Sequence, residues 1–312
     1  LFFFEGVSMT TIDTVQKFLD YVFTDNNLVA IAGLARGDEG KGKQWSQFEH
    51  MDIDFIAWPN GWWNAGHNVV LNGEKIALHE LPGWAINHNA QVYLWQSKLI
   101  NIVDVIKELD QLKDKWLPMK VRDNLPKLVI AGNANINLSS LSGKLDLLCE
   151  IAKSKPVGTT KKWIGPTVAL QALRTGIKFH MLDDDATCLD CIETNCNLFN
   201  ANSADIFKDK DGNFIDAKIE TFKKIALKER ERENFDQSST DEKAKEMNRL
   251  LWLNADEIVA ELTQAKQALQ KKIDAWIIII DHGDMLLNHA YHSGKKIVIE
   301  HAQSIPLSVF GG

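Results

Sequence analysis

An apolar run from Leu28 to Leu34 leads almost directly into a loop rich in glycine and lysine, Gly37-Asp38-Glu39-Gly40-Lys41-Gly42-Lys43. The run has the length and composition of a buried strand. Glycines let backbone N–H groups turn inward and approach an anion closely, and lysines add positive charge. The pattern therefore predicts a strand followed by a P-loop-like phosphate-binding loop, although the spacing of a true Walker A loop is absent.

Two carboxylates, Asp38 and Glu39, lie inside this loop, where they would repel a phosphate. A divalent cation placed between carboxylate and phosphate removes that repulsion, and proton transfer is the other role open to such a group. By itself, an aspartate in a loop is more often a cap or a solvated charge. The loop indicates a nucleotide site that uses a metal ion, an acid–base group or both.

Strand and helix patterns alternate along the chain. Strands are predicted at 54–57, 127–131 and 276–280, a hairpin at 69–78, and helices at 103–112 and 138–151. The hairpin has Asn72-Gly73 at its turn, a pair that favours a type I′ turn. Strands that alternate with helices predict an α/β fold with a mainly parallel central sheet flanked by helices.

Residues 228–272 differ from the rest, because they begin with a charge run and continue rich in Gln, Lys and Ala. Such a composition is typical of solvated helix, so we interpret this stretch as a charged helical insertion. Residues 1–27 are interpreted as an N-terminal extension, and residues 28–312 as one partial domain that contains the insertion.

Composition limits the class of protein and its partners. A net charge of −7 argues against nonspecific nucleic-acid binding, and no apolar run is long enough to cross a bilayer. Cys188, Cys191 and Cys196 are spaced closely enough for a metal, but no fourth ligand stands at a familiar spacing, so ordinary reduced thiols are favoured. We expect a cytoplasmic protein with neither nucleic-acid nor membrane partners.

Five motifs in order resemble the adenylosuccinate synthetase family. The glycine loop is followed by Asn64-Ala65-Gly66-His67 with Asn72-Gly73-Glu74-Lys75, and then by Leu78-His79-x-Leu81-Pro82. The last two motifs are Gly158-Thr159-Thr160 with Ile164-Gly165-Pro166, and Gly294-Lys295-Lys296 with Glu300-x-Ala302-Gln303. The resemblance covers roughly residues 28–312 and is weakest between about 178 and 290.

The resemblance implies purine nucleotide biosynthesis by a GTP-dependent ligase that joins IMP and L-aspartate through 6-phosphoryl-IMP. It assigns the catalytic base to Asp38 and the general acid at the 6-oxygen to His67. It also assigns Mg²⁺ contacts to Asp38 and to the backbone carbonyl of Gly66. These chemical roles suit the residue types, because the reaction needs a base for the purine N1 proton and a donor for the 6-oxygen.

The resemblance also implies the nucleotide-binding residues. The GTP contacts carried over are Gly37, Asp38, Glu39, Gly40, Lys41, Gly42, Lys43, Gly66, His67 and Asn68. The IMP contacts carried over are Asp38, Glu39, Gly40, Lys41, Asn64, Ala65, Gly66, His67, Thr160, Arg174 and Gln303. In the family the arginine that Arg174 matches reaches the neighbouring subunit's IMP, so a homodimer is expected.

Family members continue into an aspartate-binding loop with arginines and a Lys-x-Asp segment that recognises guanine. Neither has a counterpart in these residues, so we expect that the 312-residue chain, if complete, does not run the full reaction. Two alternatives stay open: an inactive nucleotide-binding fragment or pseudoenzyme, and a phage-type synthetase acting on dGMP. Phage-type relatives tend to lose the loop aspartate, so the presence of Asp38 favours the IMP enzyme.

Ten tryptophans accompany only three tyrosines, and five of them stand where glycine is expected. These are Trp62, Trp84, Trp95, Trp116 and Trp163. A bulky residue in place of a glycine with positive φ would be strained. One hypothesis covers all five: UGA codons that mean glycine in the source organism were translated as tryptophan. The alternative is a divergent protein whose loops have repacked, and the codons in the gene decide between the two.

Overall fold

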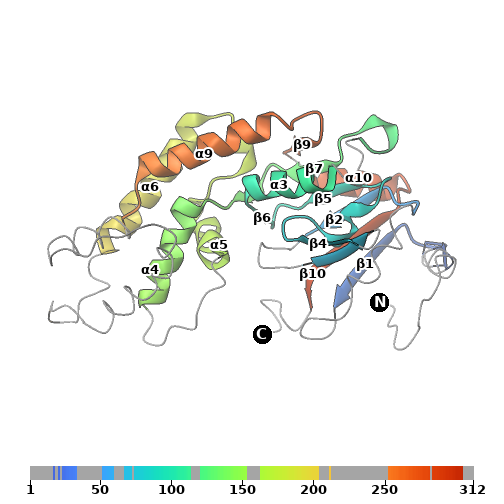
Figure 1. The fold of residues 1–312 in the computed structure, drawn as a ribbon, viewed down its shortest axis with the longest axis horizontal. Coiled ribbons are helices and arrows are strands. Elements are labelled where there is room, and N and C mark those ends of the chain that lie inside the picture. Colours follow the sequence, from blue (N-terminus) through green and yellow to red (C-terminus); the bar gives the residue numbers. More distant parts are fainter. Residues whose placement is uncertain are drawn as a thin grey trace. The chain divides into compact units, whose positions relative to one another are not determined.

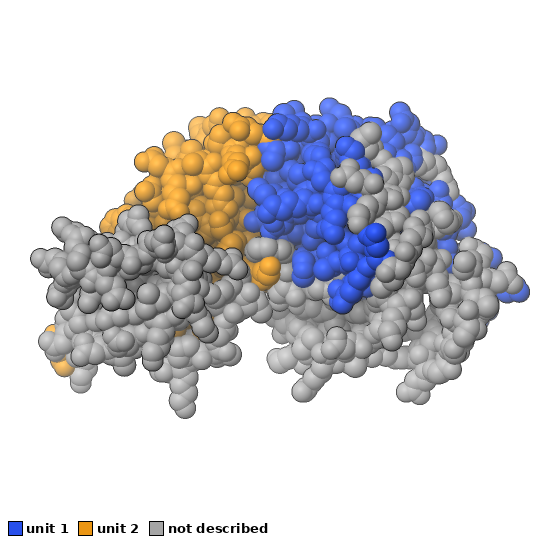
Figure 2. Space-filling view, in the orientation of Figure 1, with its two compact units in different colours: residues 1–134, 268–312 blue, residues 135–267 orange. Residues whose placement is uncertain are grey.

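A computed structural model gives the fold of the chain (Figure 1). The structure describes residues 17, 20–21, 23–33, 51–59, 67–71, 74–113, 120–152, 162–203, 211, 252–281 and 283–304. It divides into two compact units, coloured separately in Figure 2: unit 1 comprises residues 1–134 and 268–312, and unit 2 comprises residues 135–267.

Unit 1 is built around a six-stranded sheet. In spatial order its strands are β1 (Leu28–Gly33), β10 (Ile297–Ser304), β2 (Phe55–Trp58), β5 (Gln91–Leu94), β7 (Leu128–Ala131) and β9 (Ile277–Ile280). Every neighbouring pair is parallel. The predicted α/β class with a mainly parallel sheet is confirmed.

The central strands β2, β5 and β7 are buried at every position. Continuous burial is what a parallel sheet requires, because helices and loops cover both of its faces. The strand expected at 276–280 exists as β9, but it lies at the sheet edge, so Ile277 is buried while Ile278 to Ile280 are half-buried.

Among the described residues of unit 1, helices α3 (Ile102–Lys113) and α10 (Gly283–His292) accompany this sheet (Figure 1). Helix α3 matches the helix predicted at 103–112 and buries an apolar stripe that includes Val105, Leu109 and Leu112. Helix α10 contacts β7. Short elements are the 3₁₀ turns η2 (Gly83–Ile86) and η3 (Arg122–Asn124), and the two-residue strand β6 (Leu99–Ile100).

The predicted hairpin is present as β3 (His67–Leu71) and β4 (Glu74–Leu78), paired antiparallel. In its register His67 lies opposite Leu78 and Asn68 lies opposite Ala77. Burial alternates along β4, where Ile76 and Leu78 are buried and the intervening residues are exposed. The hairpin therefore rests on the rest of the unit by one face.

Unit 2 is mostly helical. Its elements are β8 (Asn135–Ile136), the π-helical turn η4 (Ser139–Gly143), α4 (Lys144–Ala152), α5 (Ile164–Leu173), η5 (Phe179–Met181), α6 (Asp185–Ser203) and most of α9 (Ala255–Gln270). The helix predicted at 138–151 thus begins with a π turn. Helix α9 lies within the predicted insertion at 228–272, but residues 228–251 lie outside the described residues.

No helix among the described residues has the length and apolar character that a bilayer crossing requires.

Candidate functional site

Three neighbouring strands lead to the motifs that the sequence singled out. β1, β10 and β2 are adjacent and parallel, so their carboxyl ends share one edge of the sheet. β1 ends at Gly33, four residues before Gly37, and β2 ends at Trp58, ahead of Asn64. Ligands of open parallel sheets bind outside the carboxyl ends of the strands. The described strands that precede the two motifs in the sequence therefore end at the edge where a ligand site is expected.

Most of the predicted nucleotide contacts lie outside the described residues, and their roles stay predictions. These are Gly37, Asp38, Glu39, Gly40, Lys41, Gly42, Lys43, Asn64, Ala65, Gly66 and Thr160. His67, Asn68, Arg174 and Gln303 are within the described elements. The sequence hypothesis depends most on the distance between Asp38 and His67, and Asp38 lies outside the described residues.

His67 is the first residue of β3, and its backbone position is held by pairing with Leu78 of β4. Asn68 follows it with an exposed side chain. Gln303 lies on β10, the strand between β1 and β2. Two of the predicted IMP contacts, His67 and Gln303, are thus carried by regular strands of unit 1.

Arg174 belongs to unit 2, where it caps the carboxyl end of α5. Its backbone is left-handed, with φ 61° and ψ 27°, and its N–H donates to the carbonyl of Gln171. Its side chain is exposed. A left-handed residue that ends a helix is usually glycine, so a non-glycine residue here is strained by about 1 kcal/mol.

Two buried carboxylates, whose contacts were not predicted, hold residues 79–84, which we call the clamped segment. Glu300 belongs to one of the family motifs, whereas Glu108 belongs to none of them. Glu108 of α3 accepts the backbone N–H groups of His79 (2.7 Å), Glu80 (3.0 and 3.1 Å) and Leu81 (3.0 Å). Glu300 of β10 accepts those of Gly83 at one oxygen (3.1 Å) and of Trp84 at the other (3.0 Å). The clamped segment begins directly after Leu78, the partner of His67.

A second group of buried charges lies at the same segment. Glu80 and Lys98 are fully buried and form an ion pair of 3.2 Å. Lys98 Nζ also lies 4.0 Å from the ring centroid of Trp58, and Glu80 accepts the N–H of Asn101 (3.2 Å). Burial raises the pKa of Glu80 and lowers that of Lys98, while their mutual attraction opposes both changes.

Burial raises the pKa of Glu108 to about 7, and the neighbouring charge of Glu80 adds to the rise. The three N–H groups that Glu108 accepts oppose it. Glu108 stands three residues after Val105 and four before Leu112, so it lies on the apolar stripe of α3. An acidic residue on such a stripe was the feature of the sequence that could have indicated its role. For Glu300 the signal was an acid within an apolar strand.

The cysteine cluster of the sequence lies along α6. Cys188 and Cys196 are buried, Cys191 is half-buried, and all three are free thiols. Burial raises the pKa of each thiol. Across the part of the chain that the structure describes, no group of His, Cys, Asp or Glu is arranged to hold a metal ion.

Among the five tryptophans at glycine-type positions, Trp163 has the left-handed backbone that glycine favours, with φ 56° and ψ 29° immediately before α5. Trp84 and Trp95 are described without positive φ. Trp62 and Trp116 lie outside the described residues. The backbone therefore matches the glycine expectation at Trp163, and the codon hypothesis stays a prediction.

Comparison with known proteins finds a match to one protein family. The sequence model of the adenylosuccinate synthetase family matches residues 30–312. The adenylosuccinate synthetase of Tropheryma whipplei (strain Twist) is 35% identical over 164 residues, which are 52% of this chain and 36% of the relative. That of Corynebacterium diphtheriae is 31% identical over 183 residues, which are 58% of this chain and 41% of the relative.

Among solved structures, the fully ligated adenylosuccinate synthetase of Plasmodium falciparum is similar in fold, with a TM-score of 0.56 and 23% sequence identity. The similarity covers 92% of this chain and 54% of that one. The chain thus matches only about half, or less, of the length of these relatives.

Proposed function

The chain belongs to the adenylosuccinate synthetase family, and we propose that it serves the GTP-dependent ligation of IMP and L-aspartate to adenylosuccinate. The residues within it would bind IMP and GTP and carry out phosphoryl transfer. The observation that carries the proposal is the sheet edge at which β1, β10 and β2 end. Two unbroken family motifs follow two of these strands, and Gln303 lies on the third.

In this proposal Asp38 accepts the N1 proton of IMP, which leaves the negative charge on the 6-oxygen. That oxygen attacks the γ-phosphorus of GTP, the bond to the β-phosphate oxygen breaks, and GDP leaves. The amino group of aspartate then attacks C6 and displaces phosphate, giving adenylosuccinate. His67 donates a hydrogen bond to the 6-oxygen while charge accumulates there.

The proposed metal is Mg²⁺, with the Asp38 carboxylate and the Gly66 carbonyl as protein ligands. Both are hard oxygen donors of the kind that Mg²⁺ prefers, and a site with few protein ligands leaves room for phosphate oxygens. When bound, the ion would neutralise phosphate charge during transfer. Lys41 and Lys43 would add positive charge at the same phosphates.

The remaining partners belong to the same proposal. Thr160 and Gln303 would contact IMP within one subunit, and Arg174 would reach the IMP of a second copy in a homodimer. The exposed side chain of Arg174 supports this assignment, because a contact across a subunit interface needs an accessible cation. We propose a cytoplasmic protein, in keeping with its net charge of −7 and its free thiols.

Isotope scrambling in GTP tests the chemistry without aspartate. GTP labelled with heavy oxygen in the β–γ bridge should scramble the label only when IMP is present, because scrambling needs reversible transfer of the γ-phosphate. Asp38→Asn should slow it by at least about 100-fold, the usual loss when an acid–base group is removed. Asp52→Asn is the matched control, since Asp52 is an exposed carboxylate paired with Lys296.

Calorimetric titration separates the alternatives. Binding of IMP without scrambling would favour a nucleotide-binding protein without catalysis, and binding of dGMP in preference to IMP would favour the phage-type reaction. Absence of binding to either nucleotide would overturn the proposed function.

A further inference from the structure

Glu300 connects parts of unit 1 that are distant in sequence. Its backbone pairs with Ile31 of β1, two residues before β1 ends, and it precedes Gln303 on β10 by three residues. Its carboxylate accepts the N–H groups of Gly83 and Trp84, which lie more than 200 residues earlier in the chain. One side chain therefore ties the sheet to the clamped segment.

The clamped segment in turn leads to His67. Leu78, the residue before it, pairs with His67 across the hairpin, and Glu108 accepts the next three N–H groups, those of residues 79–81. The segment is thus fixed at one end by α3 and at the other by β10. A substitution at Glu300 therefore releases the end of the clamped segment that is attached to the sheet, while the other end stays attached to α3.

We propose that Glu300 is a positioning residue that holds the clamped segment, and through it the start of β3, at a fixed distance from the ends of β1 and β10. This inference rests on the proposed function, because the distance matters only if His67 must meet groups that follow those strands. Glu300 itself needs no contact with substrate.

A carboxylate is required because both of its oxygens accept an N–H. A glutamine would present an NH₂ group to one of the two donors, so at least one N–H would lose its acceptor. Glu300 is only 1% exposed, and water cannot readily replace the missing acceptor. Aspartate retains both acceptor oxygens on a shorter stem and is the conservative variant.

Phosphoryl transfer is more sensitive to such a displacement than binding is. A misplacement of about 1 Å lowers a rate by roughly 100-fold when reacting groups must be aligned. Binding is spread over many contacts and changes less. A positioning role therefore predicts a large loss in the rate of isotope scrambling with a small change in IMP affinity, whereas general damage to the fold lowers both.

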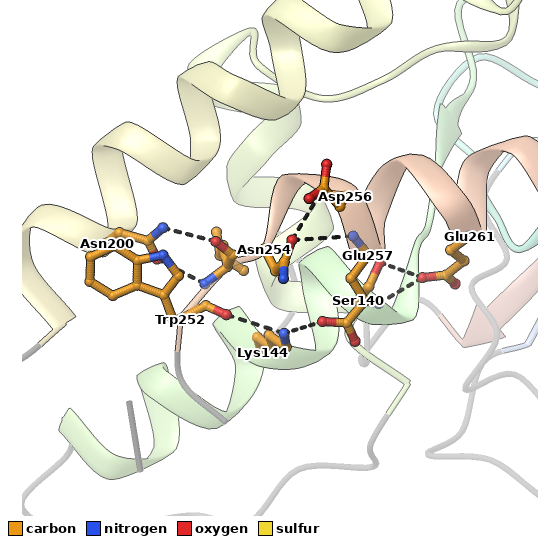
Figure 3. Close-up of polar contacts among 9 residues, drawn as sticks. Ser140, Lys144, Asn200, Trp252, Asn254, Asp256, Glu257 and Glu261 are labelled. Atoms are coloured by element: carbon orange, nitrogen blue, oxygen red, sulfur yellow. Dashed lines mark hydrogen bonds and ion pairs between the residues drawn. The ribbon is translucent and has the colours of Figure 1, made fainter. Parts of the chain in front are cut away.

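The experiment compares Glu300→Gln, Glu300→Asp and Glu261→Gln. Glu261 in unit 2 is the matched control, because its two oxygens likewise accept N–H groups from consecutive residues, Ser139 and Ser140. Figure 3 shows the contact between Glu261 and Ser140. Hydrogen exchange of the peptide that contains Gly83 and Trp84, IMP titration, and isotope scrambling are measured for each protein.

For Glu300→Gln we expect at least tenfold faster exchange at Gly83 and Trp84, roughly 100-fold slower scrambling, and an IMP dissociation constant within about fivefold of wild type. Glu300→Asp should recover part of the rate, and Glu261→Gln should match wild type in rate. If Glu300→Gln fails to fold, Glu300→Asp carries the comparison, with a loss of rate larger than its loss of affinity.

Wild-type scrambling by Glu300→Gln, or an equal loss of rate and affinity, would overturn the positioning role and leave the proposed function intact. Absence of IMP binding and of scrambling in the wild type would overturn the proposed function itself. The two failures are therefore distinguishable in one set of measurements.

Discussion

Unit 1 and unit 2 use the same chemical device in different surroundings. In unit 1, Glu300 accepts two consecutive backbone N–H groups while 1% exposed. In unit 2, Glu261 of α9 accepts the N–H and hydroxyl groups of Ser139 and Ser140. Ser139 is exposed, and Figure 3 shows the contact between Glu261 and Ser140. Water can replace Glu261 as the acceptor at the exposed Ser139, although Ser140 is 7% exposed, whereas it cannot readily replace Glu300.

One ion pair from each unit shows the same difference in burial. Glu80 and Lys98 of unit 1 are fully buried, whereas Lys144 and Glu257 of unit 2 are 16% and 53% exposed. Lys144 also donates to the carbonyl of Trp252, so α4 is tied to the residues around the start of α9 (Figure 3). The comparison teaches that the loss of a partner is severe only where the remaining charge cannot reach solvent.

The largest effect is expected from Lys98→Met. This change leaves Glu80 buried without its cation, and breaking a buried pair in this way costs about 3–5 kcal/mol. The free energy of unfolding from urea titration, followed by tryptophan fluorescence, measures the loss. Lys144→Met is the matched control in unit 2 and should lower that free energy by less than about 1 kcal/mol. Equal losses in the two variants would break the comparison.

The next largest effect is a pH dependence of the unfolding free energy, which arises from the titration of Glu108. Its pKa is raised from 4.5 to about 7, so the folded protein binds this proton more tightly than the unfolded chain. The stabilisation is therefore complete below about pH 4.5 and is lost as pH rises through 7, by roughly 3 kcal/mol in all. Burial is the largest cause of the raised pKa of Glu108, the charge of Glu80 raises it further, and the N–H groups of residues 79–81 lower it.

Unfolding of wild type and Glu108→Gln at several pH values between 4.5 and 8 isolates this contribution. The unfolding free energy of wild type, relative to that of Glu108→Gln, should fall as the pH rises from 4.5 to 8. A constant difference would show that Glu108 does not titrate in this range. Lys127 is buried, and burial lowers its pKa to about 7. Because it is present in both proteins, its contribution to the pH dependence cancels in the difference.

A smaller effect is expected for Glu300→Gln on stability. One buried N–H loses its acceptor, which costs about 2 kcal/mol when a charged acceptor is removed from a buried site. Urea unfolding measures it. A loss below about 0.5 kcal/mol would show that water enters the site and that burial of Glu300 is not what distinguishes unit 1.

The smallest effect is expected for Glu261→Gln. One of its two serine donors, Ser139, is exposed, so solvent supplies alternative partners there, while Ser140 is 7% exposed. The loss should therefore be about 1 kcal/mol. The melting temperature of this variant should therefore lie closer to wild type than that of Glu300→Gln. The reverse order of the two melting temperatures would refute the role assigned to burial.

Much of the fold followed from local patterns. Apolar runs at 54–57 and 127–131 predicted β2 and β7, and Asn72-Gly73 predicted the hairpin of β3 and β4. Periodicity at 103–112 predicted α3. These features succeed because side-chain period and turn residues act within a few positions of the chain. The division into two compact units left no such local mark.

The candidate site was predicted through its motifs, one of which includes Glu300. The contacts that the buried carboxylates Glu108 and Glu300 make were not predicted. Glu108 and Glu300 read in sequence as one acid on an apolar helix face and one acid in an apolar strand. Neither pattern reveals from which N–H groups the carboxylate accepts hydrogen bonds. The N–H groups of Gly83 and Trp84 donate to one residue, Glu300, which lies more than 200 positions away and beyond the reach of any local rule.

The sequence by itself determined many of the strands and helices, β2, β7 and α3 among them, which loop carries the glycines and lysines, and the family to which the chain is similar. Tertiary structure alone decided that β10 inserts between β1 and β2, and that Glu300 meets the clamped segment. The physical reason is range: local propensity acts over a few residues, whereas strand order and the burial of a charge depend on groups brought together only by packing.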